Sequence, residues 1–417
     1  MTSVGDGPGP VLAAEKVTFG PSPPITRLLA SISMSTDVVI GLDGLDALVK
    51  AVLARGFRAV GPVVRDGAIT LGEIAGVADL PAGWHDSQAP GSYHLDRSGD
   101  GRLFDWAVGP QSVKAELFPP SVSIWRAQAP GYRVEEVPDD AAPVAVIGAR
   151  PCDLAALDVL GRALDRSPVV DPIYHRRRGA ALLVAVECTR PASTCFCVAM
   201  GTGPGIAEGF DIALTELGSR PALEPATDGA TARFLARAGS ERGREVLADL
   251  PQHPARDEDR TERVALLARA GSRMGRAVDT TGLPELLARN LANPRWDEVA
   301  KRCLACGNCT AVCPTCFCSN LEDTTDLQGT VERRRSWASC SDLAYSYVHG
   351  GPVRSSIKSR YRQWATHKFS WWWDQFGVSG CVGCGRCITW CPPGIDITEE
   401  IAALRASDGA AQTKGGT

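Results

Sequence analysis

Two short cysteine runs in the C-terminal third of this 417-residue chain constrain its fold more than any other feature. Each run reads C-x2-C-x2-C-x3-C-P: three cysteines, each separated by two residues, precede a fourth cysteine and a proline. The cysteines are Cys303, Cys306, Cys309 and Cys313 in the first run and Cys381, Cys384, Cys387 and Cys391 in the second. This spacing is typical of cysteines that ligate iron–sulfur clusters. The sequence therefore predicts two [4Fe–4S] clusters.

The fourth cysteine of each run is expected to serve the cluster of the other run. In two-cluster bacterial ferredoxins, the cysteine before the proline ligates the partner cluster. The predicted ligands are Cys303, Cys306, Cys309 and Cys391 for the first cluster, and Cys381, Cys384, Cys387 and Cys313 for the second. Cys-x2-Cys pairs also bind structural zinc. A tandem of eight cysteines with two Cys-Pro ends favours iron–sulfur clusters over zinc.

Cysteine usage and charge narrow the class of protein. The chain has 15 cysteines, and eight of them have metal-ligand spacing, so a secreted disulfide framework is a poor interpretation. We expect a reducing, cytoplasmic compartment. No apolar run reaches membrane-spanning length, and the start lacks the features of a signal peptide. The formal net charge of −4, without a basic stretch interleaved with aromatic residues, argues against nucleic-acid binding.

The whole chain predicts an α+β fold in five segments. Composition shifts from Gly- and Pro-rich to β-prone apolar runs, then to an Ala-, Arg- and Glu-rich stretch, and then to the cysteine runs. The expected segments are a disordered extension (1–33), a mixed α/β domain (34–225), an amphipathic helical connector (226–300), a mainly helical, ferredoxin-like two-cluster domain (301–405) with a long insertion (314–380), and a flexible tail (406–417).

Several local patterns predict helices. Apolar spacing predicts a helix over 154–164, for which Asp153 is the expected N-cap. In the connector, the spacing predicts helices over 233–250 and 262–274. Residues 79–120 are rich in turn-forming residues, so we expect few regular elements there.

Two predicted strands of the α/β domain each lead to cysteines. The apolar runs 144–148 and 181–186 are typical of buried strands, and adjacent parallel strands would bring their carboxyl ends together. The cysteines that follow these strands are Cys152, Cys188, Cys195 and Cys197. Four converging thiols form a complete ligand set for a third iron–sulfur cluster or a zinc ion. The alternative is that they are small buried apolar residues, since Cys-x-Cys is not a standard cluster spacing.

The remaining cysteines, and the residues beside the second run, allow further expectations. Cys316, Cys318 and Cys340 in the insertion form a weaker candidate group for a third site. Arg386 lies inside the second run, where a cation would favour the reduced cluster. Ile388 and Trp390 are placed to shield that cluster from water, with ordinary core packing as the alternative for Trp390.

A series of further motifs appears in a recognisable order. They are Gly61-Pro62-Val63, Pro90-Gly91-Ser92-Tyr93, Gly109-Pro110, Phe118-Pro119-Pro120, Arg150-Pro151-Cys152-Asp153-Leu154, Thr194-Cys195-Phe196-Cys197, Cys313-Pro314-Thr315-Cys316-Phe317-Cys318, and a segment from Tyr361 to Phe369. With the two cysteine runs, this order resembles the β subunit of cytoplasmic heteromeric [NiFe] hydrogenases of the NAD(P)-linked or sulfhydrogenase type. It is also similar to the A subunit of anaerobic sulfite reductase. The resemblance covers residues 34–397, which makes a start of translation at Met34 plausible.

The resemblance implies an electron-transfer subunit without catalytic residues of its own. Such a subunit relays electrons between the small and large hydrogenase subunits and a subunit that binds flavin and NAD(P). Two alternatives stay open: the same relay in an anaerobic sulfite or sulfur reductase, and a reductase with its own active site between Cys152 and Cys197. The hydrogenase and the sulfite or sulfur reductase hypotheses differ in the partner rather than in the local chemistry of this chain.

Overall fold

The computed structural model describes residues 37–166, 168–218 and 232–414, and these belong to one compact unit that spans Met34–Thr417. Side chains are described as far as residue 408. The predicted disordered extension, residues 1–33, lies outside the described residues. No helix among the described residues is both long enough and apolar enough to cross a membrane.

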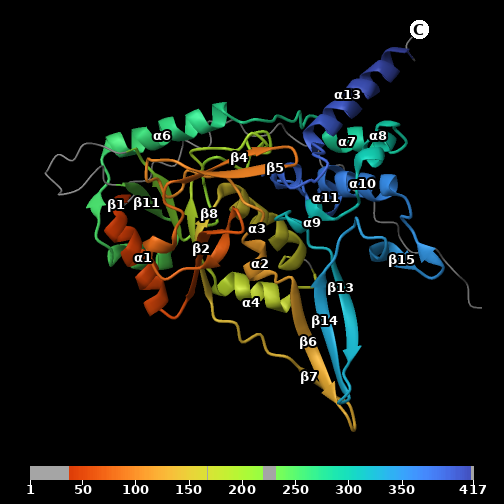
Figure 1. Ribbon diagram of the computed structural model, residues 1–417, viewed down its shortest axis with the longest axis horizontal. Helices are drawn as coiled ribbons and strands as arrows, with labels where there is room; N and C mark the ends of the chain where they lie inside the picture. Colours follow the sequence, from red (N-terminus) through yellow and green to blue (C-terminus); the bar gives the residue numbers. More distant parts are fainter. Residues whose placement is uncertain (1–36, 167, 219–231, 415–417) are drawn as a thin grey trace, which may run out of the picture. The chain divides into compact units, whose positions relative to one another are not determined.

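A mixed eight-stranded sheet forms the core of the N-terminal part of this unit (Figure 1). The strand order is β12 (His253–Pro254), β1 (Val38–Ile40), β11 (Phe234–Ala238), β10 (Ile212–Glu216), β9 (Leu182–Val186), β8 (Val144–Ala149), β2 (Arg58–Arg65) and β3 (Ala68–Glu73). The four strands β10, β9, β8 and β2 run parallel, and β11 and β3 pair antiparallel at either side of them. The predicted strands over 144–148 and 181–186 are thus confirmed as neighbouring parallel strands.

Both faces of this sheet are covered by apolar side chains. On β8, Ile147 belongs to a core that also contains side chains of α1 (Leu42–Ala54) and α5 (Glu241–Ala248). Val146 points to the opposite face, where it packs in a core with side chains of α3 (Pro151–Leu164) and α4 (Pro172–Ala180). Burial on both faces explains why these strands are continuous apolar runs without alternation.

Helix α3 begins three residues earlier than the sequence predicts. Pro151 occupies the first turn, where its missing N–H costs no hydrogen bond. Asp153 is not the N-cap; its carboxylate accepts a hydrogen bond from the backbone N–H of Arg150 at 3.2 Å from inside the first turn. The Arg-Pro-Cys-Asp motif is therefore the start of the helix, directly after the carboxyl end of β8.

The helix predicted over 233–250 is wrong in its first part. Phe234–Ala238 forms β11, which lies between β1 and β10 in the sheet. Its Phe-Leu-Ala-Arg-Ala sequence has a composition that suits a helix, but Phe234 and Leu235 are both fully buried by the flanking layers. Tertiary packing thus overrides a local helical preference here. The rest of this region does form helices, α5 and then α6 (Asp257–Ser272).

A hairpin that the sequence does not predict lies within residues 79–120. Its strands are β4 (Trp84–Ala89) and β5 (Ser92–Arg97), joined at Pro90 and Gly91. Gly91 has a φ of +72°, and its N–H donates to the carbonyl of Ile388 at 3.1 Å. A Cβ at Gly91 would lie 3.0 Å from the carbonyl oxygen of Cys391. The turn is therefore in close contact with the second cysteine run.

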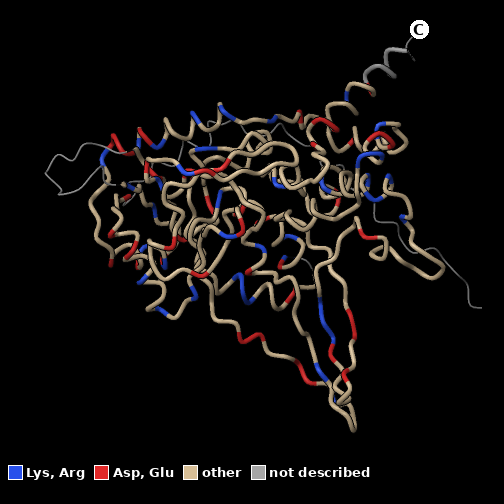
Figure 2. The backbone as a smooth tube through the Cα atoms, viewed as in Figure 1, with Lys and Arg blue, Asp and Glu red and all other residues tan. Residues whose placement is uncertain are grey.

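A second sheet joins the insertion to the α/β part of the chain. Its strand order is β13 (Ser319–Thr325), β14 (Thr330–Trp337), β6 (Ser121–Gln128) and β7 (Arg133–Glu136). These strands extend together away from the main sheet (Figure 1). Basic and acidic residues run along β13 and β14 (Figure 2), and Arg333 pairs with Asp323 across the ladder at 2.6 Å. Because β14 pairs with β6, the insertion is built into the fold rather than appended to it.

Helices, most of them short, surround the two cysteine runs. They are α7 (Leu283–Arg289), α8 (Arg295–Arg302), α9 (Asn308–Ala311), α10 (Ile357–Thr366), α11 (Trp372–Phe376), α12 (Arg386–Thr389) and α13 (Ile397–Lys414), with a π-helical turn at His367–Trp371. The remaining elements are α2 (Lys114–Leu117), β15 (Tyr347–Val348), β16 (Gly351–Pro352) and 3-10 turns at Val77–Asp79 and Ala344–Ser346. Trp296, Trp364 and Leu404 lie in their common core. The expected flexible tail includes residues that are helical as far as Lys414.

We expect Glu187 to be critical for the stability of the main sheet. Its carboxylate is completely buried, and it accepts hydrogen bonds from Arg263 at 2.6 Å, Arg237 at 3.1 Å and Thr215 at 2.6 Å. Glu187→Ala would leave two largely buried guanidinium groups without their anion, which costs on the order of 3–5 kcal/mol. A large fall in the midpoint of anaerobic thermal unfolding is the expected result.

The control for this prediction is an exposed ion pair. Glu241 pairs with Arg244 at the surface of α5, and Glu241→Ala should change the free energy of unfolding by about 0.5 kcal/mol or less. Equal effects of the two substitutions would contradict the role given to Glu187.

Candidate metal centre

The two cysteine runs fold into loops with the same backbone shape. In each loop, the residue before the second cysteine has a positive φ: Ala305 at +51° and Gly383 at +64°. The glycine after the second cysteine also has a positive φ, +79° at Gly307 and +74° at Gly385, and a short helix follows. These repeated positive φ values bend each run around a common centre, as three ligands of one cluster require.

A repeated hydrogen bond accompanies this shape. The N–H of Ala305 donates to Sγ of Cys303, and the N–H of Gly383 donates to Sγ of Cys381, each at 3.4 Å. Hydrogen bonds to cysteine sulfur are one of the means by which proteins set cluster potentials. The two loops therefore offer equivalent first ligands.

The thiols of the first predicted set face one cavity. Its lining includes Cys303, Cys306 and Cys309 from the first run and Cys391 from the second, together with Cys387 of the second predicted set. Burial, followed by the neighbouring thiols of Cys303 and Cys391, raises the pKa of Cys309 to about 12. The side-chain amide of Asn308 donates a hydrogen bond to the carbonyl of Trp390 at 3.2 Å, which connects the two runs at this point.

The second predicted set also converges. Burial raises the pKa of Cys387, and the neighbouring thiols of Cys381, Cys384 and Cys313 raise it further. Cys309 contributes to the same shift, so the two sets lie side by side. The structure thus brings together each crossed set, although the assignment of individual ligands stays a prediction.

Three buried cations surround the second set. The ammonium of Lys114 donates to the carbonyls of Cys313 at 2.8 Å and Cys316 at 3.1 Å. The ammonium of Lys368 donates to the hydroxyl of Thr315 at 2.9 Å. Burial lowers the pKa of Lys114, and the thiolates around it partly oppose this shift.

Arg386 is the third cation, and it is fixed more firmly than the sequence suggests. Its guanidinium forms a buried ion pair with Asp153 at 2.9 Å and donates to the carbonyl of Gly109, also at 2.9 Å. The pKa of Arg386 is raised, because Asp153 and the thiol of Cys384 outweigh the effect of burial. The charge beside the second set is therefore held in place by the first turn of α3.

The residues predicted to shield the second set differ in burial. Ile388 is fully buried, whereas Trp390 is half-buried and stacks on Tyr93 of β5 with ring centroids 5.1 Å apart. Trp390 therefore packs against the hairpin that the sequence did not predict.

The loop that carries Cys195 and Cys197 packs directly on the second run. The N–H of Phe196 donates to the carbonyl of Gly383 at 2.9 Å. A Cβ on Gly383 would lie 2.7 Å from backbone atoms of Cys197. Only glycine permits this approach, so the second run and the α/β part are in backbone contact here.

The other cysteines fall into two places. Cys152, Cys188, Cys195 and Cys197 gather at the carboxyl ends of β8 and β9. Cys316, Cys318 and Cys340 lie beyond Cys313, and the thiol of Cys340 is hydrogen-bonded to that of Cys318. Among the described residues, no three His, Cys, Asp or Glu side chains are arranged to hold a single metal ion.

Lys114 and Lys368 were not expected from the sequence. Lys114 lies far from the cysteine runs along the chain, and Lys368 lies in the insertion between them. The spacing of the cysteines therefore gives no signal for either lysine. Lys114 stacks on Trp337 at 3.8 Å, which also contributes to its burial. The available hint for Lys368 is that it lies within the motif from Tyr361 to Phe369.

Comparison with known proteins supports the metal assignment. Residues 302–395 match the 4Fe-4S dicluster domain family. The chain is 31% identical over 266 residues to sulfhydrogenase 2 subunit beta of Pyrococcus furiosus, an alignment that covers 62% of this chain and 73% of the relative. No solved structure matches the chain significantly.

The arrangement fits two [4Fe–4S] clusters, as the dicluster domain implies. Eight thiols stand in two converging groups, and the N–H donors and buried cations beside them suit anionic clusters. When bound, such clusters accept and donate single electrons. The chain is thus a dicluster electron-transfer protein.

Crossed ligation makes a specific prediction for Cys313. Cys313→Ala should remove or alter the same cluster signal in electron paramagnetic resonance as Cys384→Ala. Its effect should differ from that of Cys306→Ala, which removes a ligand of the other set. A spectrum in which Cys313→Ala matches Cys306→Ala would sink the crossed assignment.

The buried charge of Lys368 should raise the potential of the second cluster. At an effective dielectric constant of ~20, a unit charge a few ångströms away contributes on the order of a few kcal/mol, and about 2.3 kcal/mol corresponds to about 100 mV. Lys368→Met should therefore lower the midpoint potential of that cluster by on the order of 100 mV in a redox titration. Lys301→Met, at an exposed position, is the control and should have little effect. Equal shifts in both variants would contradict this account.

Proposed function

Because the chain belongs to the family of the sulfhydrogenase β subunit, we propose that it relays electrons through its two [4Fe–4S] clusters between a [NiFe] hydrogenase module and an NAD(P)-linked flavoprotein subunit. The observation that carries this proposal is the adjacency of the two crossed thiol sets, joined through Cys309 and Cys387. An electron on the cluster of one set is then close to the cluster of the other set.

The eight cysteines of the two runs are the proposed ligands. Cys303, Cys306, Cys309 and Cys391 hold the first cluster, and Cys381, Cys384, Cys387 and Cys313 hold the second. The chain's own contribution is to fix these thiols in two rigid loops and to surround the second set with buried cations.

The two sets differ in access to solvent, which suits a relay. Cys306 of the first set is exposed, and its neighbour Leu304 is 64% exposed. Cys313 and Cys384 of the second set are buried beneath the α/β part. We therefore assign the exposed loop around Cys306 to electron exchange with a partner subunit.

The hydrogenase partner is favoured over a sulfite reductase partner because the matching relative is named as a sulfhydrogenase subunit. We propose the small and large hydrogenase subunits and a subunit that binds flavin and NAD(P) as the partners. A reducing, cytoplasmic location suits a chain whose cysteines must remain available as metal ligands.

Two measurements test this function. Affinity purification of the tagged full chain from its native host should recover hydrogenase subunits; recovery of a sirohaem subunit instead would assign it to a sulfite reductase. The isolated cluster-loaded chain should exchange electrons with dithionite and redox dyes, yet neither reduce NAD(P) nor oxidise hydrogen. Robust oxidation of NAD(P)H by the chain alone would show that it has its own active site.

A further inference from the structure

A second group of four thiols lies at the edge of the main sheet. Strands β8 and β9 are neighbours in parallel register, with Val146 opposite Leu183. Their carboxyl ends therefore meet at one edge, and each strand leads directly to a cysteine. The cysteines at this edge are Cys152 in the first turn of α3, Cys188 just after β9, and Cys195 and Cys197 on the loop that follows.

The four thiols are linked as neighbours through Cys197, which interacts electrostatically with each of the other three. Cys195 interacts electrostatically with both Cys188 and Cys197, and Cys152 interacts with Cys197. Three of the four residues are buried, and Cys188 is half-buried. Four cysteines from three segments of the chain thus converge on one place.

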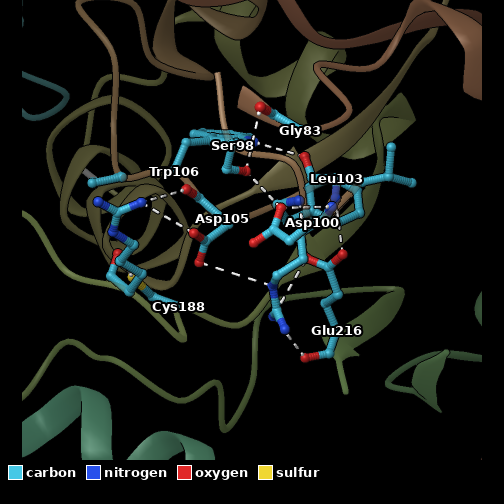
Figure 3. Close-up of polar contacts among 12 residues, drawn as sticks. Gly83, Ser98, Asp100, Leu103, Asp105, Trp106, Cys188 and Glu216 are labelled. Atoms are coloured by element: carbon cyan, nitrogen blue, oxygen red, sulfur yellow. Dashed lines mark hydrogen bonds and ion pairs between the residues drawn. The ribbon is translucent and has the colours of Figure 1, made fainter. Parts of the chain in front are cut away.

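The segment that carries Cys188 is held in position. Arg190 donates to the carboxylate of Asp105 at 3.0 Å, and the N–H of Leu103 donates to Glu216 at 2.8 Å (Figure 3). Cys188 lies close enough to Asp105 for the two to interact electrostatically. The loop is therefore fixed by the polar network that Figure 3 shows.

A buried cation lies beside these thiols. Arg150 is 2% exposed and donates to the carbonyls of Phe104 at 2.9 Å and Trp106 at 2.7 Å, while its Nε has no hydrogen-bond partner. No carboxylate among the described residues forms an ion pair with Arg150. Arg150 interacts electrostatically with the thiol of Cys188 and with the buried carboxylate of Glu216. The desolvation of a buried guanidinium is costly, and an anionic group held by the four cysteines would stabilise it in addition to Glu216.

We propose that Cys152, Cys188, Cys195 and Cys197 ligate a third iron–sulfur cluster, which extends the electron path from the second cluster into the α/β part of the chain. The site is in contact with the second run: Sγ of Cys195 lies 3.7 Å from the carbonyl oxygen of Cys384, a proposed ligand of that run. Transfer along the path moves one electron from one site to the next, and no bond forms or breaks. The proposal goes beyond the two-cluster relay and does not depend on the identity of the partner subunits.

Ordinary packing explains these observations less well. Buried cysteines often serve as small apolar residues, but that role does not require four cysteines to gather at one sheet edge beside a buried cation. The second Thr-Cys-Phe-Cys motif, at Thr315–Cys318, provides an internal comparison. There Cys316 adjoins Cys313, a proposed ligand of the second cluster, and two buried lysines already lie close by.

Metal analysis of the anaerobically purified full chain tests the proposal. Two [4Fe–4S] clusters account for about eight irons per chain and three for about twelve. We expect about twelve irons and, after full reduction, three paramagnetic centres by spin quantitation. About eight irons, with or without one zinc, would overturn the proposal.

A matched pair of variants locates the third cluster. Cys197 and Cys318 are each the last residue of a Thr-Cys-Phe-Cys motif. Cys197→Ser should lower the iron content from about twelve to about eight, while Cys318→Ser should leave it at about twelve. The reverse result would assign the cluster to the group around Cys316 and refute the site proposed here. If Cys197→Ser fails to fold, Cys188→Ser, at the half-buried position, serves in its place, and the spin count of the unmodified chain stands independently.

Discussion

The buried ion pair between Arg386 and Asp153 is the contact on which the relation between the two halves of the chain depends. Arg386 begins the short helix of the second cysteine run, and Asp153 lies in the first turn of α3. Both side chains are nearly inaccessible to water, so removal of either would strand a charge at a cost of about 3–5 kcal/mol. The same two segments carry Cys384 and Cys152. This ion pair therefore holds the cluster loop against the sheet edge, next to the thiols that gather there.

Charge compensation explains why so many cations are buried in this chain. Lys114, Lys368 and Arg386 surround the second thiol set, and Arg150 lies beside the thiols at the sheet edge. Arg386 is paired with Asp153 and Arg150 interacts with Glu216, whereas no carboxylate among the described residues forms an ion pair with Lys114 or Lys368. Anionic clusters would therefore offset the desolvation penalty of these two lysines most directly. Around the first set, by contrast, Cys306 is open to water, which can screen a cluster charge without protein cations. The more buried thiol set is therefore the one that has buried cations beside it.

The eight cluster cysteines were predictable because ligand spacing is a local property, written within two runs of eleven residues. Strands β8 and β9 were predictable for a similar reason, since burial on both faces produces a continuous apolar run. The wrong and missed predictions concern features that depend on contacts between distant parts of the chain. Phe234–Ala238 is a strand only because β1 and β10 flank it, and Lys114 is buried only because Trp337 and the carbonyl of Cys313 meet it from distant parts of the chain. Features decided by long-range contacts left no local pattern to find.

The contact between the Thr194–Cys197 loop and Gly383 combines a local requirement with a long-range one. Glycine at position 383 is a local requirement of the cluster loop, which needs a positive φ there, yet the equivalent position of the first run is Ala305 with a similar φ. The first run therefore shows that a side chain is tolerated when only the loop conformation is at stake. At Gly383 a Cβ would meet the backbone of Cys197 at 2.7 Å. The glycine is thus needed for the approach of the second loop as well as for the turn, and it is this approach that places the sheet-edge thiols against the second cluster rather than the first.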